Sequence, residues 1–295
     1  MSTIIEQYEP SGGSRILLPT FVDAGTITAS SAEAAAPPSN LQNKFRGKTW
    51  QSIGCASEYV DVDLGQERSI NALALVNHNL SYDAVLQVSL GSSQGAADVG
   101  EGSFPAWAPL FAFIDSIPHG YGGFVSDLEA ERLYWTGHLR LIYFEESLGA
   151  PWLRLGITDP GNAAGFLEAG RLLAGTYVAA AKQPNVGTGN RPVDPSVTTY
   201  SKGGQGWKDC LPQYREATYQ YVYTPGDETY VVWYDFLRRV GTGAPFVFDA
   251  FPAMTNVDLR LNNLLYCEIP QDAIQPVQIS HRARGAVSLQ IRESL

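Results

Sequence analysis

The sequence has few cysteines, few charged residues and no long apolar run. Only 3 of its 295 residues are cysteines, and 17 % are charged. Cys55, Cys210 and Cys267 are far apart and form no CxxC pair, so we expect free thiols rather than a zinc or iron–sulfur site. No stretch of about 20 apolar residues is present, which argues against a membrane-spanning helix. Residues 1–14 have no basic start and no apolar run, so we predict no signal peptide.

The residues that catalysis and nucleic-acid binding require are also scarce. A net charge of −10 argues against a protein that binds nucleic-acid phosphates. None of the four histidines lies in a G-x-S-x-G context, and no glycine-rich loop joins a strand to a helix. Asp61 and Asp63 are the obvious carboxylate pair for a glycosidase, two residues apart on one strand face. We expect no catalytic residue, no cofactor and no metal ion.

Turn-forming and aromatic residues are abundant. The chain has 29 glycines, 18 prolines and 15 tyrosines, and few helical patterns, which favours an all-β protein with many turns. Residues 59–64 alternate, with valines and a leucine on one face and two aspartates on the other, as in a strand that is buried on one side. Gly65-Gln66 predicts a turn after them. Further strands are predicted at 15–22, 70–76, 85–90, 138–144, 152–157 and 166–178.

Several of these segments resemble the discoidin family, also called F5/8 type C or galactose-binding-like domains. The resemblance rests on the motifs WQS at 50–52, YVDVDLG at 59–65 and INAL at 70–73. The later motifs WLRL at 152–155 and LEAGRL at 167–172 are similar to the family's last strands, and NHNL at 77–80 is similar to a variant in bacteriophage tail proteins. The family likeness covers residues 15–180 and implies a jelly-roll β-sandwich.

The same likeness implies a sugar-binding site in the loops at one end of the sandwich. An aromatic ring beside amide and guanidinium donors suits a sugar ring. The other interpretation is that Trp50 is a core residue and that the asparagines form turns. The segment 42–47 replaces the family's calcium-binding Asp-Gly-Asp loop, which counts against both a calcium ion and a sugar site. The candidate glycan-binding residues are Asn43, Phe45, Arg46, Trp50, Asn77, His78, Asn79 and Trp107.

An aromatic-rich insertion follows the third strand, at residues 104–135. Three prolines exclude a single long helix there. So many large apolar groups pack either over the chain's own sandwich or against a partner. The candidate interface residues are Phe104, Trp107, Phe111, Phe113, Tyr121 and Phe124.

The chain is long enough for two domains. We expect an N-terminal arm at 1–14, the sandwich at 15–181, and a linker without regular structure at 182–207, where prolines and glycines concentrate. Residues 208–295 then predict a smaller β-rich domain with one helix, because Tyr230, Trp233, Tyr234 and Leu237 recur at helical spacing. Its strands are predicted at 215–223, 245–248, 263–269, 275–283 and 286–291.

This arrangement resembles the C-terminal domains of bacteriophage tail-tip and baseplate proteins. The first functional hypothesis is therefore a structural subunit of a long-tailed bacteriophage tail tip or baseplate, made in the host cytoplasm and carried in the virion. Its expected partners are other tail subunits, further copies of itself in a ring or trimer, and host-surface glycans. The alternative is a carbohydrate-binding module or adhesin for a surface polysaccharide, and a third hypothesis is a polysaccharide hydrolase that uses Asp61 and Asp63.

Overall fold

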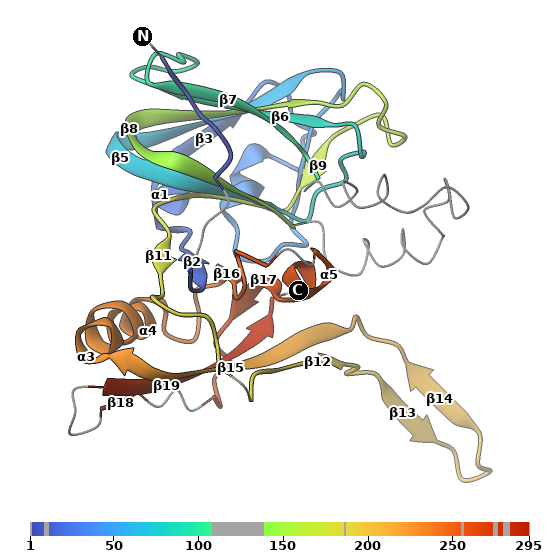
Figure 1. The fold of residues 1–295 in the computed structure, drawn as a ribbon. Helices are drawn as coiled ribbons and strands as arrows, with labels where there is room; N and C mark the ends of the chain where they lie inside the picture. Colours follow the sequence, from blue (N-terminus) through green and yellow to red (C-terminus); the bar gives the residue numbers. More distant parts are fainter. Residues whose placement is uncertain are drawn as a thin grey trace, which may run out of the picture.

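The computed structural model describes residues 2–8, 12–107, 139–185, 187–254, 257–273, 277–279 and 284–294. Two β-rich bodies lie one above the other, which confirms the all-β class (Figure 1). We call the upper body, built on a seven-stranded sheet, the sandwich, and the lower body, built on an eight-stranded sheet, the second domain. None of the helices in the described ranges is long and apolar enough to cross a membrane.

Two long antiparallel strands form the framework of the sandwich. The first half of β5 pairs with the second half of β8, and the second half of β5 pairs with the start of β8. The register shifts between Asp63 and Arg68, so the strand pair changes course there. Aliphatic side chains fill the space that these strands enclose. The strands of this sheet are β1 (Thr3–Ile4), β3 (Thr26–Ala29), β5 (Glu58–Val76), β6 (Val85–Gly91), β7 (Gly100–Pro105), β8 (Leu139–Thr158) and β10 (Arg171–Gly175).

The predicted turn at Gly65-Gln66 is an irregularity inside one strand. Gly65 has a φ of +71°, a value that glycine adopts at little cost. The Asp63 carboxylate accepts a hydrogen bond from the Gly65 amide at 2.8 Å. Residues 59–64 and 70–76 therefore belong to a single bent strand, and the prediction of two strands joined by a turn is wrong. Glycine occurs in both bulges and turns, so the sequence does not distinguish them. Here β5 pairs with β8 on both sides of Gly65, which identifies an irregularity within one strand.

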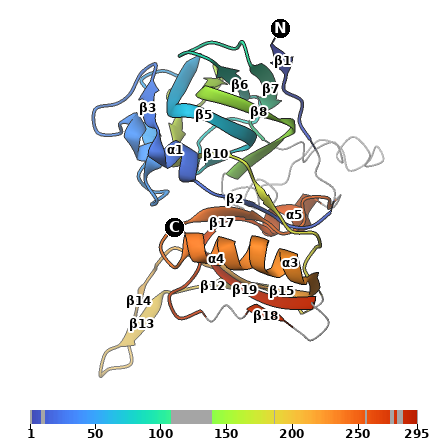
Figure 2. The same ribbon diagram turned by 90° about the vertical axis from the view of Figure 1, so that its left-hand side faces the viewer.

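The second domain is one sheet with a helical segment lying across a face (Figure 2). That segment runs without a break through α3 (Gly226–Glu228), the π-helical η3 (Thr229–Tyr234) and α4 (Asp235–Val240), and it confirms the predicted helix. Trp233 and Phe236 point inward and are buried. The strands, in sheet order, are β11 (Val178–Ala179), β2 (Arg15–Leu17), β16 (Phe246–Asp249), β17 (Leu264–Glu268), β19 (Arg284–Glu293), β15 (Tyr214–Pro225) and β12 (Gly189–Val193), with β18 (Val277–Ile279) beside β19.

The remaining elements are short. They connect or flank the strands that form the two sheets, and the helices α1 and α5 were not predicted. These elements are α1 (Thr20–Ala24), the 3₁₀ helix η1 (Pro38–Gln42), β4 (Trp50–Gln51), β9 (Glu168–Ala169), α5 (Val257–Asn262), β13 (Val197–Tyr200) and β14 (Gly206–Asp209).

The N-terminal residues are shared between the two bodies. Thr3–Ile4 adds a parallel strand to the sandwich beside β7. Residues 15–17, predicted as a strand of the sandwich, pair instead with β16 and β11 in the second domain. All three residues of β2 are buried, so their side chains suit an interior position in either sheet.

The predicted linker carries regular structure, so the expectation of a segment without strands is wrong. Residues 189–193 form β12 at the edge of the sheet. Pro192 has no backbone N–H to donate, and an edge strand tolerates that loss. Strands β13 and β14 then form a two-stranded hairpin. Residues 194–211, which contain this hairpin, project away from the rest of the second domain (Figure 1). We call this segment the arm; it is distinct from the N-terminal arm predicted at residues 1–14.

A shared apolar core joins the sandwich to the second domain. Tyr143 and Leu173 of the sandwich pack with Leu17, Val247 and Tyr266 of the second domain. The Tyr143 hydroxyl also donates a hydrogen bond to the buried Asp249 carboxylate at 3.1 Å. The two bodies are therefore held in one orientation by buried contacts, and not by a tether alone.

Candidate functional site

The turn at residues 42–47 presents an aromatic ring to solvent at one end of the sandwich. Gln42, at the end of η1, donates two hydrogen bonds from its side-chain amide, to the carbonyls of Val22 and Gly25, at 2.7 and 2.8 Å. The Asn43 side chain accepts a hydrogen bond from the Phe45 amide at 3.0 Å, which closes the turn. The Phe45 side chain is 52 % exposed. The Lys44 ammonium lies 5.1 Å from the centre of the Phe45 ring.

The second domain holds this turn in place from below. The Tyr266 hydroxyl donates to the Lys44 carbonyl at 3.0 Å, and the Arg46 guanidinium lies 3.2 Å from a carboxylate oxygen of Glu293. Arg215 binds the same carboxylate through two of its nitrogens. Burial opposes ionisation of Glu293, but the hydrogen bonds and charges of Arg215 and Arg46 outweigh it and lower its pKa. Glu293 therefore stays ionised and fixes Arg46.

Asn77 locks the other side of the turn. Its backbone has a φ of +56°, in the left-handed region that asparagine tolerates better than most residues. Its side-chain amide donates to the Arg46 carbonyl at 2.9 Å. The Gly170 amide donates to the Asn77 carbonyl, and a side chain at Gly170 would clash with the Arg46 carbonyl oxygen. Asn77 and Gly170 thus support the turn from within, as turn-forming residues.

Asn79 and His78 also have internal roles. The Asn79 side chain donates to the Phe166 carbonyl at 2.9 Å and accepts from the Glu168 amide at 2.8 Å. The His78 ring is buried and meets the Trp107 ring edge-on, with 5.1 Å between ring centres. Both side chains stabilise the loops beside the exposed turn, and neither is presented to solvent as a major contact surface.

The two tryptophans predicted to contact a glycan differ in burial. Trp50 has no exposed surface; its ring lies in the sandwich core and its indole N–H donates to the Ser31 carbonyl at 3.1 Å. This corrects the expectation that Trp50 faces a ligand, and agrees with the other interpretation, in which Trp50 is a core residue. Trp107 is half-buried, and its indole N–H lies 3.0 Å from the carbonyl oxygens of both Leu80 and Ser81.

The predicted aromatic interface falls only partly within the described residues. Phe104 is buried in the sandwich core and stacks on Phe144 at 6.3 Å between ring centres. Phe104 therefore packs within its own chain, and the prediction that it contacts a partner is wrong. Phe111, Phe113, Tyr121 and Phe124 lie outside the described residues.

The two strand aspartates are occupied by structural contacts. Asp61 is buried and receives two hydrogen bonds from Arg154, at 2.6 and 2.7 Å, and one from Gln94 at 3.1 Å. Asp63 accepts from the backbone at the bulge described above. One carboxylate is paired with a guanidinium and the other holds a backbone irregularity, so neither is placed to act as a general acid.

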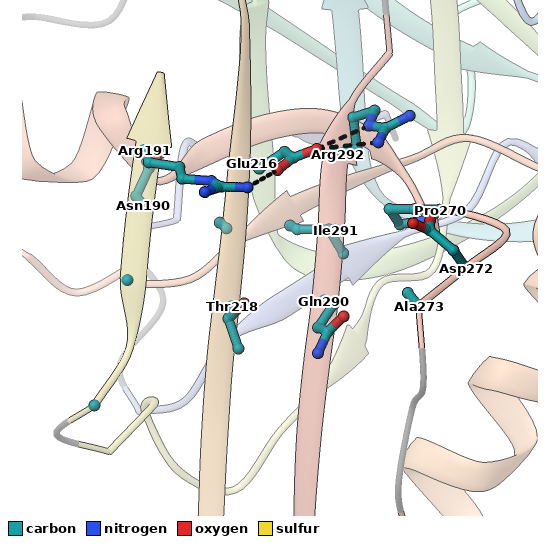
Figure 3. A pocket seen from close by; sticks show the side chains of 13 residues that line it. Asn190, Arg191, Glu216, Thr218, Pro270, Asp272, Ala273, Gln290, Ile291 and Arg292 are labelled. Carbon is teal, nitrogen blue, oxygen red and sulfur yellow. Dashed lines mark hydrogen bonds and ion pairs between the residues drawn. The ribbon is translucent and has the colours of Figure 1, made fainter. Parts of the chain in front are cut away.

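A polar hollow of about 520 Å³ lies on the outer face of the second domain (Figure 3). Glu216 of β15 stands between two arginines, 2.8 Å from Arg191 and 3.0 Å from Arg292. The hydrogen bond from Arg191, together with Arg292, lowers the pKa of Glu216. No motif in the sequence predicts this hollow. Its only signal is the alternation along β15, where Glu216 and Thr218 face out while Tyr219 and Tyr221 face in.

Comparison with known proteins gives partial matches. No family model matches the sequence, and no curated protein matches it significantly. Among solved structures, a family 32 carbohydrate-binding module from Clostridium perfringens NanJ, in complex with galactose, is 15 % identical with a TM-score of 0.35; the match covers 55 % of this chain and 98 % of that one.

Two further solved structures match at the same level. A fucose-binding module from Streptococcus pneumoniae is 11 % identical, with a TM-score of 0.35 and coverage of 53 % of this chain and 96 % of the module. A chitosan-binding module from a Paenibacillus chitosanase/glucanase is 18 % identical, with a TM-score of 0.35 and coverage of 54 % and 98 %. These similarities concern about half of the chain and assign no ligand to it.

Proposed function

We propose that this chain is a non-catalytic carbohydrate-binding protein whose sugar contact is the turn at residues 42–47. The observation that carries the proposal is the exposed Phe45 ring, set in a turn that also holds Asn43, Lys44 and Arg46. A flat apolar face with polar groups around it suits a sugar ring, which has apolar C–H faces and hydroxyl groups at its edge. The solved structures described above include modules for galactose, fucose and chitosan, but the proposal rests on the turn.

The rigidity of the turn supports this function. Four contacts fix it before any ligand arrives: Gln42 to the Val22 carbonyl, Asn77 to the Arg46 carbonyl, Tyr266 to the Lys44 carbonyl, and Arg46 to Glu293. A preorganised contact surface loses less conformational entropy on binding than a mobile loop does. The asparagines and the histidine of the sequence-predicted site therefore contribute by support, while Phe45 and Lys44 make the contact.

A glycan array followed by calorimetry on the best glycan tests the proposal. Phe45→Ala is expected to weaken binding about five- to twelvefold, because loss of a stacking aromatic ring costs about 1–1.5 kcal/mol. Tyr223→Ala is the matched control, since Tyr223 is 65 % exposed but lies in the second domain, away from the turn, and it should leave affinity unchanged. Absence of binding to every glycan, or equal loss in both variants, would contradict the proposal.

A second function is favoured by a different observation, the shared core between the two bodies. A sandwich fixed in orientation on a second domain suits a structural subunit that presents the sandwich outward. In this form the chain is a subunit of a long-tailed bacteriophage tail tip or baseplate, in the virion with other tail proteins. Mass spectrometry of purified particles tests this: the chain should be present in fixed proportion to other tail proteins, and its absence from particles would reject the assignment. The two functions are compatible.

A further inference from the structure

The arm exposes apolar side chains that nothing in the described chain covers. All eight residues of β13 and β14 are exposed. Val197, Tyr200 and Trp207 have exposed fractions of 55 %, 74 % and 65 %, and Leu211 at the base of the hairpin has 44 %. Large apolar patches on a surface usually mark a binding interface. An isolated two-stranded hairpin is only marginally stable in water, so packing against another surface would stabilise the arm.

The helical segment exposes a second apolar surface on the same domain. Tyr230, Val231 and Tyr234 are exposed by 55 %, 73 % and 53 %, and we call these three residues the helix surface. The two tyrosine rings meet edge-on, with 6.0 Å between their centres. All three residues belong to the π-helical turn η3, an irregularity that occurs frequently at functional sites. The opposite side of the same segment is buried through Trp233 and Phe236.

The arm and the helix surface lie at opposite ends of the second domain. In Figure 1 the arm projects to the lower right, whereas α3 and α4 lie at the lower left. In Figure 2, seen from the side of the helices, the arm recedes behind them. The arm of one molecule therefore points away from its own helix surface and is free to reach the helix surface of another.

We propose that the arm of one copy of this chain docks on the helix surface of a second copy. The chain itself supplies both halves of the contact: two exposed apolar surfaces that bear aromatic rings and lie at opposite ends of the second domain. Lys202, at the tip of the arm, and Asp227, next to the helix surface, are both exposed and carry opposite charges, which favours this pairing. The contact joins two different surfaces, so it is head-to-tail and closes into a ring if the rotation between copies permits.

Sedimentation velocity over a concentration series tests self-association. The unchanged protein is expected to form species larger than a dimer as its concentration rises. An arm variant, Tyr200→Ser with Trp207→Ser, and a helix-surface variant, Val231→Asp with Tyr234→Ser, should each sediment as a monomer. The control carries Ile53→Ser and Tyr82→Ser, at two sandwich positions exposed by 71 % and 54 %, and should assemble like the unchanged protein. Unchanged protein that stays monomeric throughout would overturn the proposal.

A mixing experiment separates head-to-tail contact from other geometries. The arm variant keeps an intact helix surface, and the helix-surface variant keeps an intact arm. An equimolar mixture of the two should therefore form a dimer and nothing larger. Assembly of the helix-surface variant alone would show an arm-to-arm contact and reject the proposal, and so would a mixture that remains monomeric although both variants show the circular dichroism of the unchanged protein.

Self-association and sugar binding use different surfaces, so each can fail without the other. Phe45 lies at the end of the sandwich, whereas the arm and the helix surface belong to the second domain. Phe45→Ala is expected to assemble normally, and the arm variant is expected to bind the same glycan with unchanged affinity per site.

Discussion

The sandwich core consists mainly of aliphatic side chains, whereas the core of the second domain is rich in aromatic ones. Valine, leucine, isoleucine and alanine fill the space inside β5 and β8. Tyr219, Tyr221, Trp233, Phe246 and Phe248 dominate the second domain. Aliphatic side chains need no polar partner, but a buried tyrosine hydroxyl does.

The aromatic core draws polar partners from distant parts of the chain. The Tyr219 hydroxyl donates to Asn263 at 2.9 Å, and the Tyr221 hydroxyl lies 2.6 Å from the hydroxyl of Ser14. Desolvation raises the pKa of both tyrosines, so both remain protonated. The need for Ser14 helps to explain why the N-terminal strand β2 joins the second domain. The sandwich core thus depends mainly on shape, whereas the core of the second domain also depends on hydrogen bonds to its tyrosine hydroxyls.

The largest expected effect is loss of a core tryptophan in either body. Trp50→Ala in the sandwich and Trp233→Ala in the second domain should each lower the free energy of unfolding by about 3–5 kcal/mol, because both side chains are fully buried. Urea unfolding followed by circular dichroism measures this. Since the two bodies share a core, each variant should unfold in a single transition, and two separate transitions would show that the bodies are stable independently.

Asp249, which lies at the contact between the two bodies, should make the stability of the protein depend on pH. Burial raises the pKa of Asp249 to about 6, against the opposing effects of Arg260 and of the hydrogen bond from Tyr143. The folded protein thus holds this proton more tightly than the unfolded chain does. The stability that protonation of Asp249 contributes is complete below the unfolded pKa of 3.8 and is lost as pH rises toward 6.

Asp249→Asn tests this effect because the amide is neutral at every pH. The difference in unfolding free energy between the variant and the unchanged protein should change by about 2 kcal/mol between pH 4 and pH 7. Urea midpoints measured at half-unit steps of pH give the result. Parallel pH profiles for the two proteins would show that Asp249 does not titrate abnormally.

A smaller effect of opposite sign is expected at Glu293, which joins Arg46 of the sandwich to Arg215 of the second domain. Its folded pKa is lowered, so the stability it contributes is present above the unfolded pKa of 4.5 and is lost as pH falls through the folded value. Glu293→Gln should cost about 2 kcal/mol at pH 7, the range for a hydrogen bond to a charged group. Thermal unfolding at pH 7 and pH 3 checks the prediction, and the cost should shrink at the lower pH.

The smallest effect belongs to the exposed ion pair in the polar hollow. Arg191 is 75 % exposed and contacts Glu216, which keeps Arg292 as a second partner. Arg191→Ala should leave the melting temperature unchanged, because surface ion pairs contribute little. A clear fall in melting temperature, comparable with that of Glu293→Gln, would show that the hollow is a stabilising element.

Local patterns predicted the strands that have one buried face. Residues 59–64, 215–223 and 286–291 alternate, and each is a strand with its apolar side inward, except that Tyr223, at a register shift, is 65 % exposed. The helical spacing from Tyr230 to Leu237 was equally informative. Two features carried no such signal. The short strand β2 becomes buried, but nothing in its sequence shows which of the two sheets it joins. The arm has the glycine and proline content of a linker, so its sequence does not predict a hairpin.

The candidate site was predicted in place but not in detail. The family likeness implied that residues 43–46 and 77–79 lie together, and Asn77 does contact the Arg46 carbonyl. Which of them face solvent was not predictable, because asparagine and tryptophan serve equally well as ligand contacts and as internal supports. The contacts that decided the matter come from residues more than 200 positions away, Tyr266 and Glu293.

Sequence by itself determined the all-β class, the strands with one buried face and the helix of the second domain, because alternation and helical spacing arise within a few residues. The tertiary structure decided three further features: β2 joins the second domain, Phe45 remains exposed while Trp50 is buried, and the arm projects without covering. The physical reason is that burial depends on neighbours brought together from remote parts of the chain. A side chain's local pattern states only that it could be buried, and its partners in space decide whether it is.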